Sequence, residues 1–286
     1  MILERLSILN YRNIEQAELS FSPKLNCFLG NNGMGKTNLL DAIYYLSFCK
    51  SHTNPIDSQN IRHDADFALM QGWYVQDDKR DEYLCSLKRR QKKIFRKNKK
   101  EYEKLSDHIG SLPLVLISPS DSEIILGGSE ERRKLMDVVI SQFDKEYLQR
   151  LIKYNNALSQ RNALLRSDNL ADPMLFQLWE EQLVQEGNHI FEKRKSYIEQ
   201  LKPLFQHFYD LICQSNEEVS LEYSSQLAEN DFSLMLDTKR EKDKIIGYTS
   251  VGIHRDDLDM YLGNHLMRKV GSQGQNKTYV IALKLA

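Results

Sequence analysis

The stretch GNNGMGKTNLLDAIYYLS, residues 30–47, decides the fold class that the sequence predicts. It satisfies GxxxxGK[ST], the Walker A pattern of phosphate-binding loops, with Lys36 and Thr37 in the last two positions. An apolar run at 25–29 precedes the pattern and is typical of a strand, while apolar residues at helical spacing in 38–47 indicate a helix. Strand, glycine loop and helix in this order are the setting that a phosphate loop requires, so an α/β protein is predicted.

Each residue type in this loop has a chemical reason. Glycines let the backbone take positive φ angles and approach phosphates closely, so that successive N–H groups and the positive end of the helix dipole face the anion. Lys36 adds a mobile charge for the β and γ phosphates, and the Thr37 hydroxyl is a ligand for Mg²⁺, so we expect ATP and Mg²⁺ as cofactors. The alternative is a glycine-rich turn with an exposed lysine. The predicted ATP-binding residues of the loop are Gly30, Asn31, Asn32, Gly33, Met34, Gly35, Lys36 and Thr37.

The composition is that of a globular protein and indicates no particular ligand. Of the 286 residues, 41% are apolar and 28% are charged, and 39 basic against 40 acidic side chains give a formal net charge of -1. Any polyanion must therefore be bound by a local basic patch rather than by the overall field.

Cysteine spacing and apolar runs bear on the compartment. Cys27, Cys49, Cys85 and Cys213 lie far apart with no CxxC pair, which argues against a zinc site and fits free thiols in a reducing compartment. The first residues lack the apolar core of a signal peptide, and no uncharged apolar stretch approaches the ~20 residues that a membrane span requires. We expect a cytoplasmic protein with no membrane association.

The first part of the chain reads mostly as strands. Residues 2–9 form one predicted strand, and alternating apolar and polar residues at 16–21 form a second. Strand patterns return from 67 onwards and end with the apolar run PLVLI at 113–117. These segments predict the sheet of the phosphate-loop domain.

A helical region follows and interrupts this domain. From residue 120 apolar residues keep helical spacing with few glycines, and breaks are expected at Pro173 and Pro203. Strand character returns near the end of the chain, before a last helix. We therefore expect 1–119 and 241–286 to form one head with a shared sheet, and 120–240 to be an all-helical lobe inserted between them.

The stretch GSQGQNKTYVIALKLA, residues 271–286, predicts a second and smaller anion-binding turn. Ser272, Gly274 and Gln275 stand directly before a helix, where a hydroxyl, a bare backbone and a helix N-terminus converge. Taken alone, the pattern fits an ordinary loop with a capped helix equally well.

Short motifs spread along the whole chain give a family resemblance. Besides the Walker A stretch, they are ILNYRNIE at 8–15, IRH at 61–63, SPSD at 118–121, GGSEERRKLMD at 127–137, QRNALLR at 160–166, GIHRDDL at 252–258 and SQGQ at 272–275. In these motifs the sequence resembles the RecF family of bacterial recombination-repair ATPases, which belongs to the ABC/SMC-like class. The resemblance implies a P-loop ABC-type ATPase head, a mixed sheet with helices, into which a helical lobe is inserted.

The resemblance also implies that ATP drives the formation of a homodimer. Two heads of this class sandwich two nucleotides, and a γ phosphate contacted by the second chain makes dimerisation depend on the nucleotide state. Beside the loop, Arg12 and Asn13 match positions of nucleotide contacts, although an exposed turn arginine explains Arg12 nearly as well. The signature residues that would contact ATP in trans are Ser272, Gln273, Gly274 and Gln275.

By resemblance, the function is ATP-dependent DNA binding in recombinational DNA repair and replication restart, including the SOS response to DNA damage. The DNA would be single-stranded or gapped, and the implied protein partner is the recombination mediator RecR. Two other classes share the phosphate loop: the ATPase subunit of an ABC transporter and a small-molecule kinase. The 235 positions from Thr37 to Ser272 (272 − 37) exceed what a plain transporter head needs, and a kinase needs no signature turn.

The sequence departs from the family pattern in three places. Gly271 and Gln273 replace the Leu and Gly of the usual ABC signature, and Ile253 stands where the family typically has proline. The chain also stops at Ala286, before the Walker B segment whose acids hold magnesium and the attacking water in this class. We therefore expect a truncated chain that hydrolyses ATP poorly or not at all, and we assign no catalytic residue. The resemblance implies that intact members of the family are slow, DNA-stimulated ATPases.

A basic segment at 87–105 is the predicted DNA contact. Such a cluster neutralises phosphates and makes binding strongly salt-dependent. The alternative is an exposed hairpin that turns at 96–99 and carries its charges for solubility at a sheet edge. The DNA-contact residues of this prediction are Arg89, Arg90, Lys92, Lys93, Arg96, Lys97, Lys99 and Lys100.

His254, Arg255 and Asp256 combine residue types used in acid and base catalysis. We expect them instead to tie the sheet to neighbouring loops through hydrogen bonds. A direct chemical role is the alternative.

Overall fold

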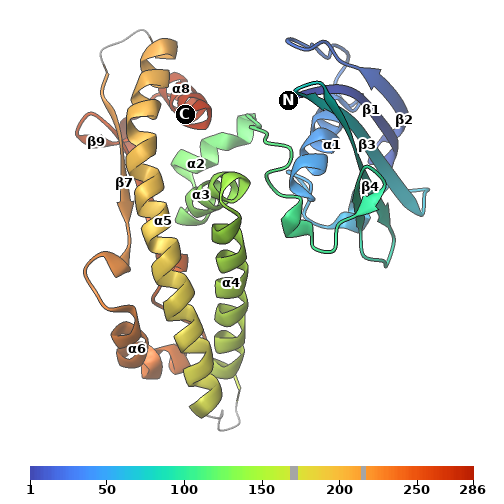
Figure 1. The fold of residues 1–286 in the computed structure, drawn as a ribbon. Coiled ribbons are helices and arrows are strands. Elements are labelled where there is room, and N and C mark those ends of the chain that lie inside the picture. Colours follow the sequence, from blue (N-terminus) through green and yellow to red (C-terminus); the bar gives the residue numbers. More distant parts are fainter. Residues whose placement is uncertain (168–172, 214–216) are drawn as a thin grey trace. The chain divides into compact units, whose positions relative to one another are not determined.

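The computed structural model of the chain describes residues 1–167, 173–213 and 217–286. The chain forms two compact units, residues 1–116 and 117–286, which are described in turn (Figure 1). Each unit has a hydrophobic core of its own.

The first unit is an antiparallel sheet with α1 (Lys36–Phe48) packed against β1, β3 and β4. Among the described residues the strand order is β2-β1-β3-β4-β5-β6, and every neighbouring pair is antiparallel. Short 3-10 turns, η1 (Asp57–Gln59) and η2 (Leu105–Asp107), lie in the connections. The strands are β1 (Ile2–Tyr11), β2 (Ile14–Ser20), β3 (Phe67–Gln76), β4 (Lys79–Lys88), β5 (Ile94–Lys97) and β6 (Lys100–Glu101).

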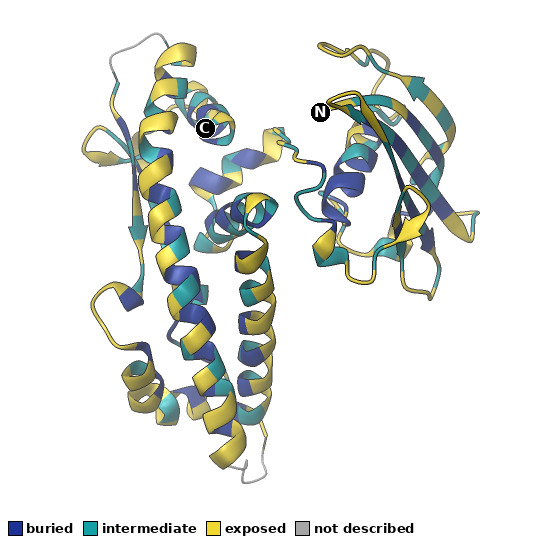
Figure 2. Cartoon of the chain, viewed as in Figure 1, coloured by how far each residue is buried: buried dark blue, intermediate teal, exposed yellow. Residues whose placement is uncertain are grey.

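Alternation along the strands decides which side of this sheet is buried. On β3, every second residue from Ala68 to Tyr74 is buried while the residues between them are partly exposed, because successive side chains point to opposite faces (Figure 2). On α1, Ala42 and Leu46 belong to the same core and lie four residues apart on one helix face. The alternating pattern in the sequence therefore placed the long strands correctly.

Two expected strands are absent from the described structure. Residues 25–29 and 113–117 are not strands, and Leu25, Leu29 and Val115 are 84%, 88% and 59% exposed. Within the described residues, neither segment belongs to a strand of either sheet. Both segments are apolar, but the prediction that they are strands is wrong.

The second unit combines helices with a small sheet, in which β7, β8 and β9 pair antiparallel in that order. Three short 3-10 turns, η3 (Pro119–Ser122), η4 (Gln226–Ala228) and η5 (Ile253–Arg255), connect the elements. The helices are α2 (Glu123–Leu126), α3 (Ser129–Phe143), α4 (Lys145–Leu165), α5 (Pro173–Cys213), α6 (Phe232–Ile246), α7 (Met267–Val270) and α8 (Gln273–Leu285). The strands are β7 (Val219–Ser224), β8 (Asp257–Leu262) and β9 (His265–Leu266).

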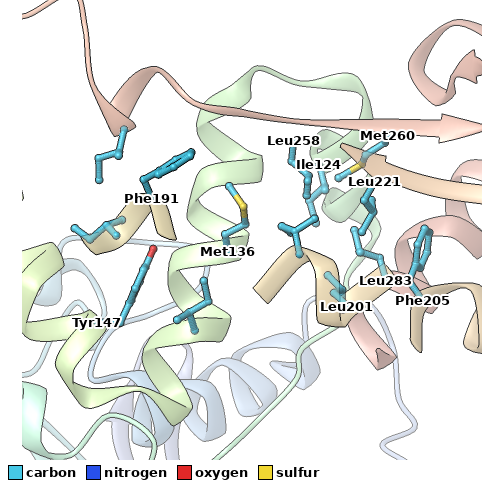
Figure 3. Close-up of a cluster of buried hydrophobic side chains, with 14 of the residues drawn as sticks. Ile124, Met136, Tyr147, Phe191, Leu201, Phe205, Leu221, Leu258, Met260 and Leu283 are labelled. Carbon is cyan, nitrogen blue, oxygen red and sulfur yellow. The ribbon is translucent and has the colours of Figure 1, made fainter. Parts of the chain in front are cut away.

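The core of the second unit draws on both its helices and its strands. Side chains from α5, the small sheet and α8 meet in one apolar cluster, so the sheet and the last helix are held to the long helix by burial (Figure 3). The labelled members of this cluster are Ile124, Met136, Tyr147, Phe191, Leu201, Phe205, Leu221, Leu258, Met260 and Leu283.

The long helix α5 corrects one expectation about proline. Pro173 begins the helix as expected, but the helix runs through Pro203 instead of breaking there. A proline inside a helix costs about 3 kcal/mol, and the complete burial of Phe205 and near-complete burial of Leu201 beside it offset that cost. Although α5 is long, none of the helices in the described ranges combines the length and apolar character that a membrane span needs.

The small sheet corrects two further expectations. β7 lies inside the segment 120–240, so that segment is largely helical but not all-helical; Val219 and Leu221 alternate with polar residues and were the overlooked strand signal. β8 pairs with β7 and β9, not with the strands of the first unit, so the expected shared sheet is wrong within the described residues. The reason is that Leu258 and Met260 bury their side chains in the core of the second unit. The division into an ATPase head and a lobe stays a prediction.

Candidate nucleotide-binding site

The phosphate loop connects the open segment after β2 to the start of α1. Gly33 and Gly35 have φ angles of +81° and +91°, in the left-handed region that residues with a Cβ rarely adopt. A Cβ built on Gly33 meets no heavy atom within 4 Å, whereas one built on Gly35 lies 2.8 Å from Asn13 Oδ1. Gly33 is therefore required by its backbone angle, and Gly35 by both its angle and the close approach of Asn13.

The first turn of α1 presents its N–H groups to the loop. Gly35 is the N-cap, and it has no side-chain cap hydrogen bond. The first hydrogen bond of the helix runs from Leu39 N–H to Gly35 O, at 2.9 Å. The N–H groups of residues 36–38 therefore have no acceptor within the helix. Free N–H groups and the positive end of a helix dipole are the features that an anion site requires.

Lys36 and Thr37 are the first two residues of α1 and are partly exposed and exposed, respectively. The Lys36 Nζ donates to Gly30 O at 2.6 Å and to Asn31 O at 2.8 Å, so the ammonium lies folded across the loop that it belongs to. Thr37 is exposed, which leaves its hydroxyl available to Mg²⁺ held by phosphate oxygens. Within the described residues, no cluster of three or more His, Cys, Asp or Glu side chains forms a protein cage for a metal.

Arg12 lies in the turn between β1 and β2 and reaches toward the same helix. Its φ is +52°, and its side chain is only 18% exposed, which does not fit an exposed turn arginine. The guanidinium donates to Asn38 Oδ1 at 3.1 Å, to Ser51 Oγ at 2.9 Å and to Asn60 Oδ1 at 2.9 Å. These acceptors place Arg12 beside the first turn of α1.

Asn13 contacts the loop directly. Its Nδ2 donates to Gly33 O at 2.8 Å, and its Oδ1 accepts from Asn38 Nδ2 at 2.7 Å. The two predicted residues Arg12 and Asn13 are therefore brought to the phosphate loop by the β1–β2 turn.

The predicted signature turn is the N-terminus of α8. Ser272 is the N-cap, and its Oγ accepts from Gln275 N at 3.2 Å while Gln275 Oε1 accepts from Ser272 N at 2.9 Å, a reciprocal capping box. Gln275 Nε2 also donates to Glu217 Oε1 at 2.8 Å. Gln275 is thus occupied within its own chain, whereas Ser272, Gln273 and Gly274 are exposed. Because the Ser272 oxygen acts as acceptor in the cap, its hydroxyl proton is the part that another group can bind.

The basic segment separates into anchored and exposed side chains. Arg89 donates to Ala65 O at 3.0 Å, Lys93 donates to Cys49 O at 2.7 Å, and Lys97 pairs with an aspartate of β4 at 2.8 Å. These three cations are engaged in the first unit's own structure. The exposed members of the predicted set are Arg90, Lys92, Arg96, Lys99 and Lys100.

The segment contains a hairpin, as the alternative interpretation expected, but its turn is at 98–99 rather than 96–99, because Arg96 and Lys97 belong to β5. β5 and β6 pair antiparallel around Asn98 and Lys99, whose φ angles of +49° and +69° are those of a tight two-residue hairpin turn. The hairpin is compatible with both the DNA and the solubility interpretation, and the DNA contact stays a prediction.

The motif around His254 is tied to its surroundings as expected. Tyr154 OH donates to His254 Nδ1 at 2.8 Å, and His254 Nε2 donates to Thr249 O at 2.9 Å. Burial lowers the pKa of His254 to about 4, so the imidazole is neutral near pH 7. Asp256 pairs with the buried Arg194 at 3.0 Å, and burial raises its pKa above the usual range. These contacts confirm the hydrogen-bonding role that the sequence predicted.

A phosphate loop at the start of a helix, a sheet and a large helical part define the class as a P-loop ATPase of the ABC/SMC-head type. The family model described as AAA domain matches residues 5–246. The DNA replication and repair protein RecF of Bacteroides thetaiotaomicron is 58% identical over 287 residues, which cover 100% of this chain and 78% of the relative. The RecF of Porphyromonas gingivalis is 48% identical over 289 residues, covering 100% of this chain and 79% of the relative. The chain belongs to the RecF family.

Solved structures agree with this assignment. The recombination mediator protein RecF-ATP of the RecFOR pathway matches with a TM-score of 0.93 at 29% identity, over 99% of this chain and 79% of that protein. An SMC head bound to the C-winged helix domain of ScpA shares the fold, with a TM-score of 0.53 at 13% identity over 99% of this chain and 75% of that protein. The predicted family and fold class are confirmed, and the transporter alternative is not favoured.

Sequence reasoning missed part of the site. Asn38, Asp41, Ser51 and Asn60 surround Arg12, and none of them was predicted. The one signal in the sequence was Asp41, a carboxylate that interrupts the apolar face of the helix after Walker A.

Proposed function

We propose that this protein binds ATP and DNA in the cytoplasm and acts in recombinational DNA repair and replication restart. The observation that carries the proposal is the phosphate loop, in which left-handed glycines, the uncapped start of α1 and Lys36 converge. A relative with 29% identity was solved as RecF-ATP and matches 99% of this chain, which supports the same ligand here.

ATP would bind with its phosphates against the first turn of α1. Lys36 now donates to two loop carbonyls, and a bound phosphate is a stronger acceptor for its ammonium than either carbonyl. Thr37 would supply the hydroxyl ligand for Mg²⁺, and phosphate oxygens and water would supply others. ATP binding breaks no covalent bond, so it requires only the contacts of the loop. The extent of hydrolysis stays a prediction.

ATP would act as a switch for dimerisation between two copies of the chain. Ser272 is exposed, its hydroxyl proton is free to donate, and α8 begins directly after it. A γ phosphate held on a second copy would accept that proton and face the helix N-terminus. Because this attraction depends on the γ phosphate, its loss would release the dimer.

The DNA would be single-stranded or gapped, and its phosphates would contact the exposed cations of the basic segment. With a net charge of -1, the chain must bind DNA through such a local patch. The recombination mediator RecR is the protein partner that family membership supports. A transporter ATPase would instead copurify with a membrane permease, and a small-molecule kinase would transfer phosphate to a metabolite regardless of DNA.

The test is a titration with a fluorescent ATP analogue, followed by binding to a gapped DNA duplex with and without ATP. We expect Lys36→Ala to lose nucleotide binding, because it removes the cation at the phosphates, and to lose the effect of ATP on DNA binding. Lys24→Ala removes an exposed lysine outside the loop and serves as the control. Wild-type ATP affinity in the Lys36 variant would refute the phosphate site.

A further inference from the structure

Asp41 is a buried carboxylate one turn beyond the phosphate loop on α1. It is 3% exposed and accepts hydrogen bonds from Tyr11 OH at 2.5 Å, Ser51 Oγ at 2.9 Å and His52 N at 2.8 Å. Arg12 completes its surroundings with an ion pair at 3.1 Å. A buried charge is tolerated only when it is paired and hydrogen-bonded, and Asp41 satisfies both conditions.

The pair Asp41–Arg12 is the charged end of a chain of side chains. Arg12 Nη1 donates to Asn38 Oδ1 at 3.1 Å, so the amide of Asn38 must turn its Nδ2 the other way. That Nδ2 donates to Asn13 Oδ1 at 2.7 Å, and the Nδ2 of Asn13 donates to Gly33 O at 2.8 Å. A side-chain amide carries one acceptor oxygen and one donor NH₂ group. When the oxygen accepts from the preceding residue, the NH₂ group is therefore directed to the next residue.

This chain of donors ends on the backbone of the phosphate loop. In a trans peptide unit, the C=O of one residue and the N–H of the next point in opposite directions. With its carbonyl oxygen held by Asn13, the peptide between Gly33 and Met34 directs the Met34 N–H away from Asn13. A reversed peptide would instead present a carbonyl oxygen where an anion site needs a donor.

We propose that Asp41 is a positioning residue for nucleotide binding, which fixes the orientation of the Gly33–Met34 peptide through Arg12, Asn38 and Asn13. In this inference Asp41 does not contact the nucleotide. It acts through the side chains of Arg12, Asn38 and Asn13, which are called the relay below. The inference rests on the proposed binding of ATP at the loop. It differs from a general packing role, because its effect should be transmitted along the relay and reach the loop.

Asp57 provides a control in the same unit, with similar partners but a side chain that is 39% exposed, against 2% for Asp41. It accepts from Tyr45 OH and pairs with Lys93 at 2.9 Å, so it repeats the combination of tyrosine, carboxylate and cation found at Asp41. No described hydrogen bond of Asp57 leads to the phosphate loop. A change that merely weakens the core around α1 should therefore appear in Asp57→Asn as well as in Asp41→Asn.

The experiment measures the affinity of the full chain for a fluorescent ATP analogue. Asp41→Asn removes the charge that Arg12 requires, and we expect about tenfold weaker binding. Asp57→Asn should bind within about twofold of the wild type, while both variants should remain folded by circular dichroism. Equal affinity in the wild type and a folded Asp41 variant overturns the inference, and so does an equal loss in the Asp57 variant.

A double-mutant cycle with Asn13→Ala tests the relay itself. Because both changes interrupt one pathway, the combined variant should bind about as weakly as the weaker single variant, whereas independent effects would multiply and overturn the relay. If Asp41→Asn does not fold, Asn38→Ala, at a partly exposed position of α1, replaces it in the cycle. Lys36→Ala separates the hypothesis of an ATP site from that of the relay. Wild-type ATP binding in the Lys36→Ala variant refutes the ATP site. Loss of binding in that variant, together with unchanged binding in Asp41→Asn, refutes the relay alone.

Discussion

Replacing Gly35 by alanine should weaken ATP binding more than the same change at Gly33. Both residues have left-handed φ angles, and holding an L residue there costs about 1–2 kcal/mol, or about tenfold in affinity if the loop must adopt this form to bind. At Gly33 the added methyl enters open space, so no further cost is expected. The two variants therefore share one penalty and differ in the second.

The second penalty at Gly35 comes from Asn13. The new Cβ would lie 2.8 Å from Asn13 Oδ1, too close for any real contact, so the Asn13 side chain must move. Moving it breaks its bonds to Gly33 O and Asn38 Nδ2, each worth about 1 kcal/mol. The total for Gly35→Ala is then about 3–4 kcal/mol, a loss of several hundredfold in affinity.

The assay is equilibrium titration of both variants with a fluorescent ATP analogue, repeated in an Asn13→Ala background. With Asn13 truncated, the methyl at residue 35 has room, so Gly35→Ala should cost only the backbone penalty of about tenfold. Equal losses for Gly33→Ala and Gly35→Ala in the wild-type background would show that Asn13 does not act as described. An undiminished Gly35→Ala penalty in the Asn13→Ala background would show the same.

Three further predictions concern other parts of the chain. Ser272→Arg should leave nucleotide binding intact yet abolish ATP-dependent dimers, because the bulky cation blocks the exposed turn; normal dimers in sedimentation would contradict the trans contact. Lys99→Glu combined with Lys100→Glu should weaken DNA binding and flatten its dependence on salt, whereas Lys24→Glu should not, and an unchanged slope returns the hairpin to the solubility interpretation. The pKa of His254 falls from 6.5 to about 4 on folding, so the unfolded chain takes up this proton first as the pH drops. Its contribution to stability is complete above pH 6.5 and declines toward pH 4, by about 2 kcal/mol at pH 5. Urea unfolding of His254→Gln should lack this decline, while His207→Gln, changed at an exposed histidine of α5, should retain it.

The sequence predicted those parts of the site that follow from local pattern. Gly35, Lys36 and Thr37 were proposed because a phosphate loop needs these residue types at fixed spacing, and Ser272 because a hydroxyl, a bare backbone and a helix N-terminus converge there. Their roles in binding ATP stay predictions. The hydrogen bonds of His254 were also expected in kind. These features depend on neighbours in the chain, which the sequence displays directly.

What the sequence could not predict depends on residues far apart in the chain. Asn60 reaches Arg12 across 48 positions, and no spacing rule connects them. The strand inference at 25–29 was wrong for a related reason, because apolar character predicts burial or pairing but does not identify the partner. The continuation of α5 through Pro203 likewise reflects the packing of Phe205 in the core, which overrides local propensity.

The length of α5 has a mechanical consequence. A helix of 41 residues is a rod about 60 Å long, so a tilt of about 5° at one end displaces the other by about 5 Å. Near the first turns of α5, Glu180 forms an ion pair with Arg240 of α6. Near its last turns, Phe205 makes an edge-to-face contact with Tyr279 of α8, with ring centroids 4.7 Å apart. If α5 tilted as a rigid body about its end near α6, α8 would move with it, and so would the turn at Ser272 where α8 begins.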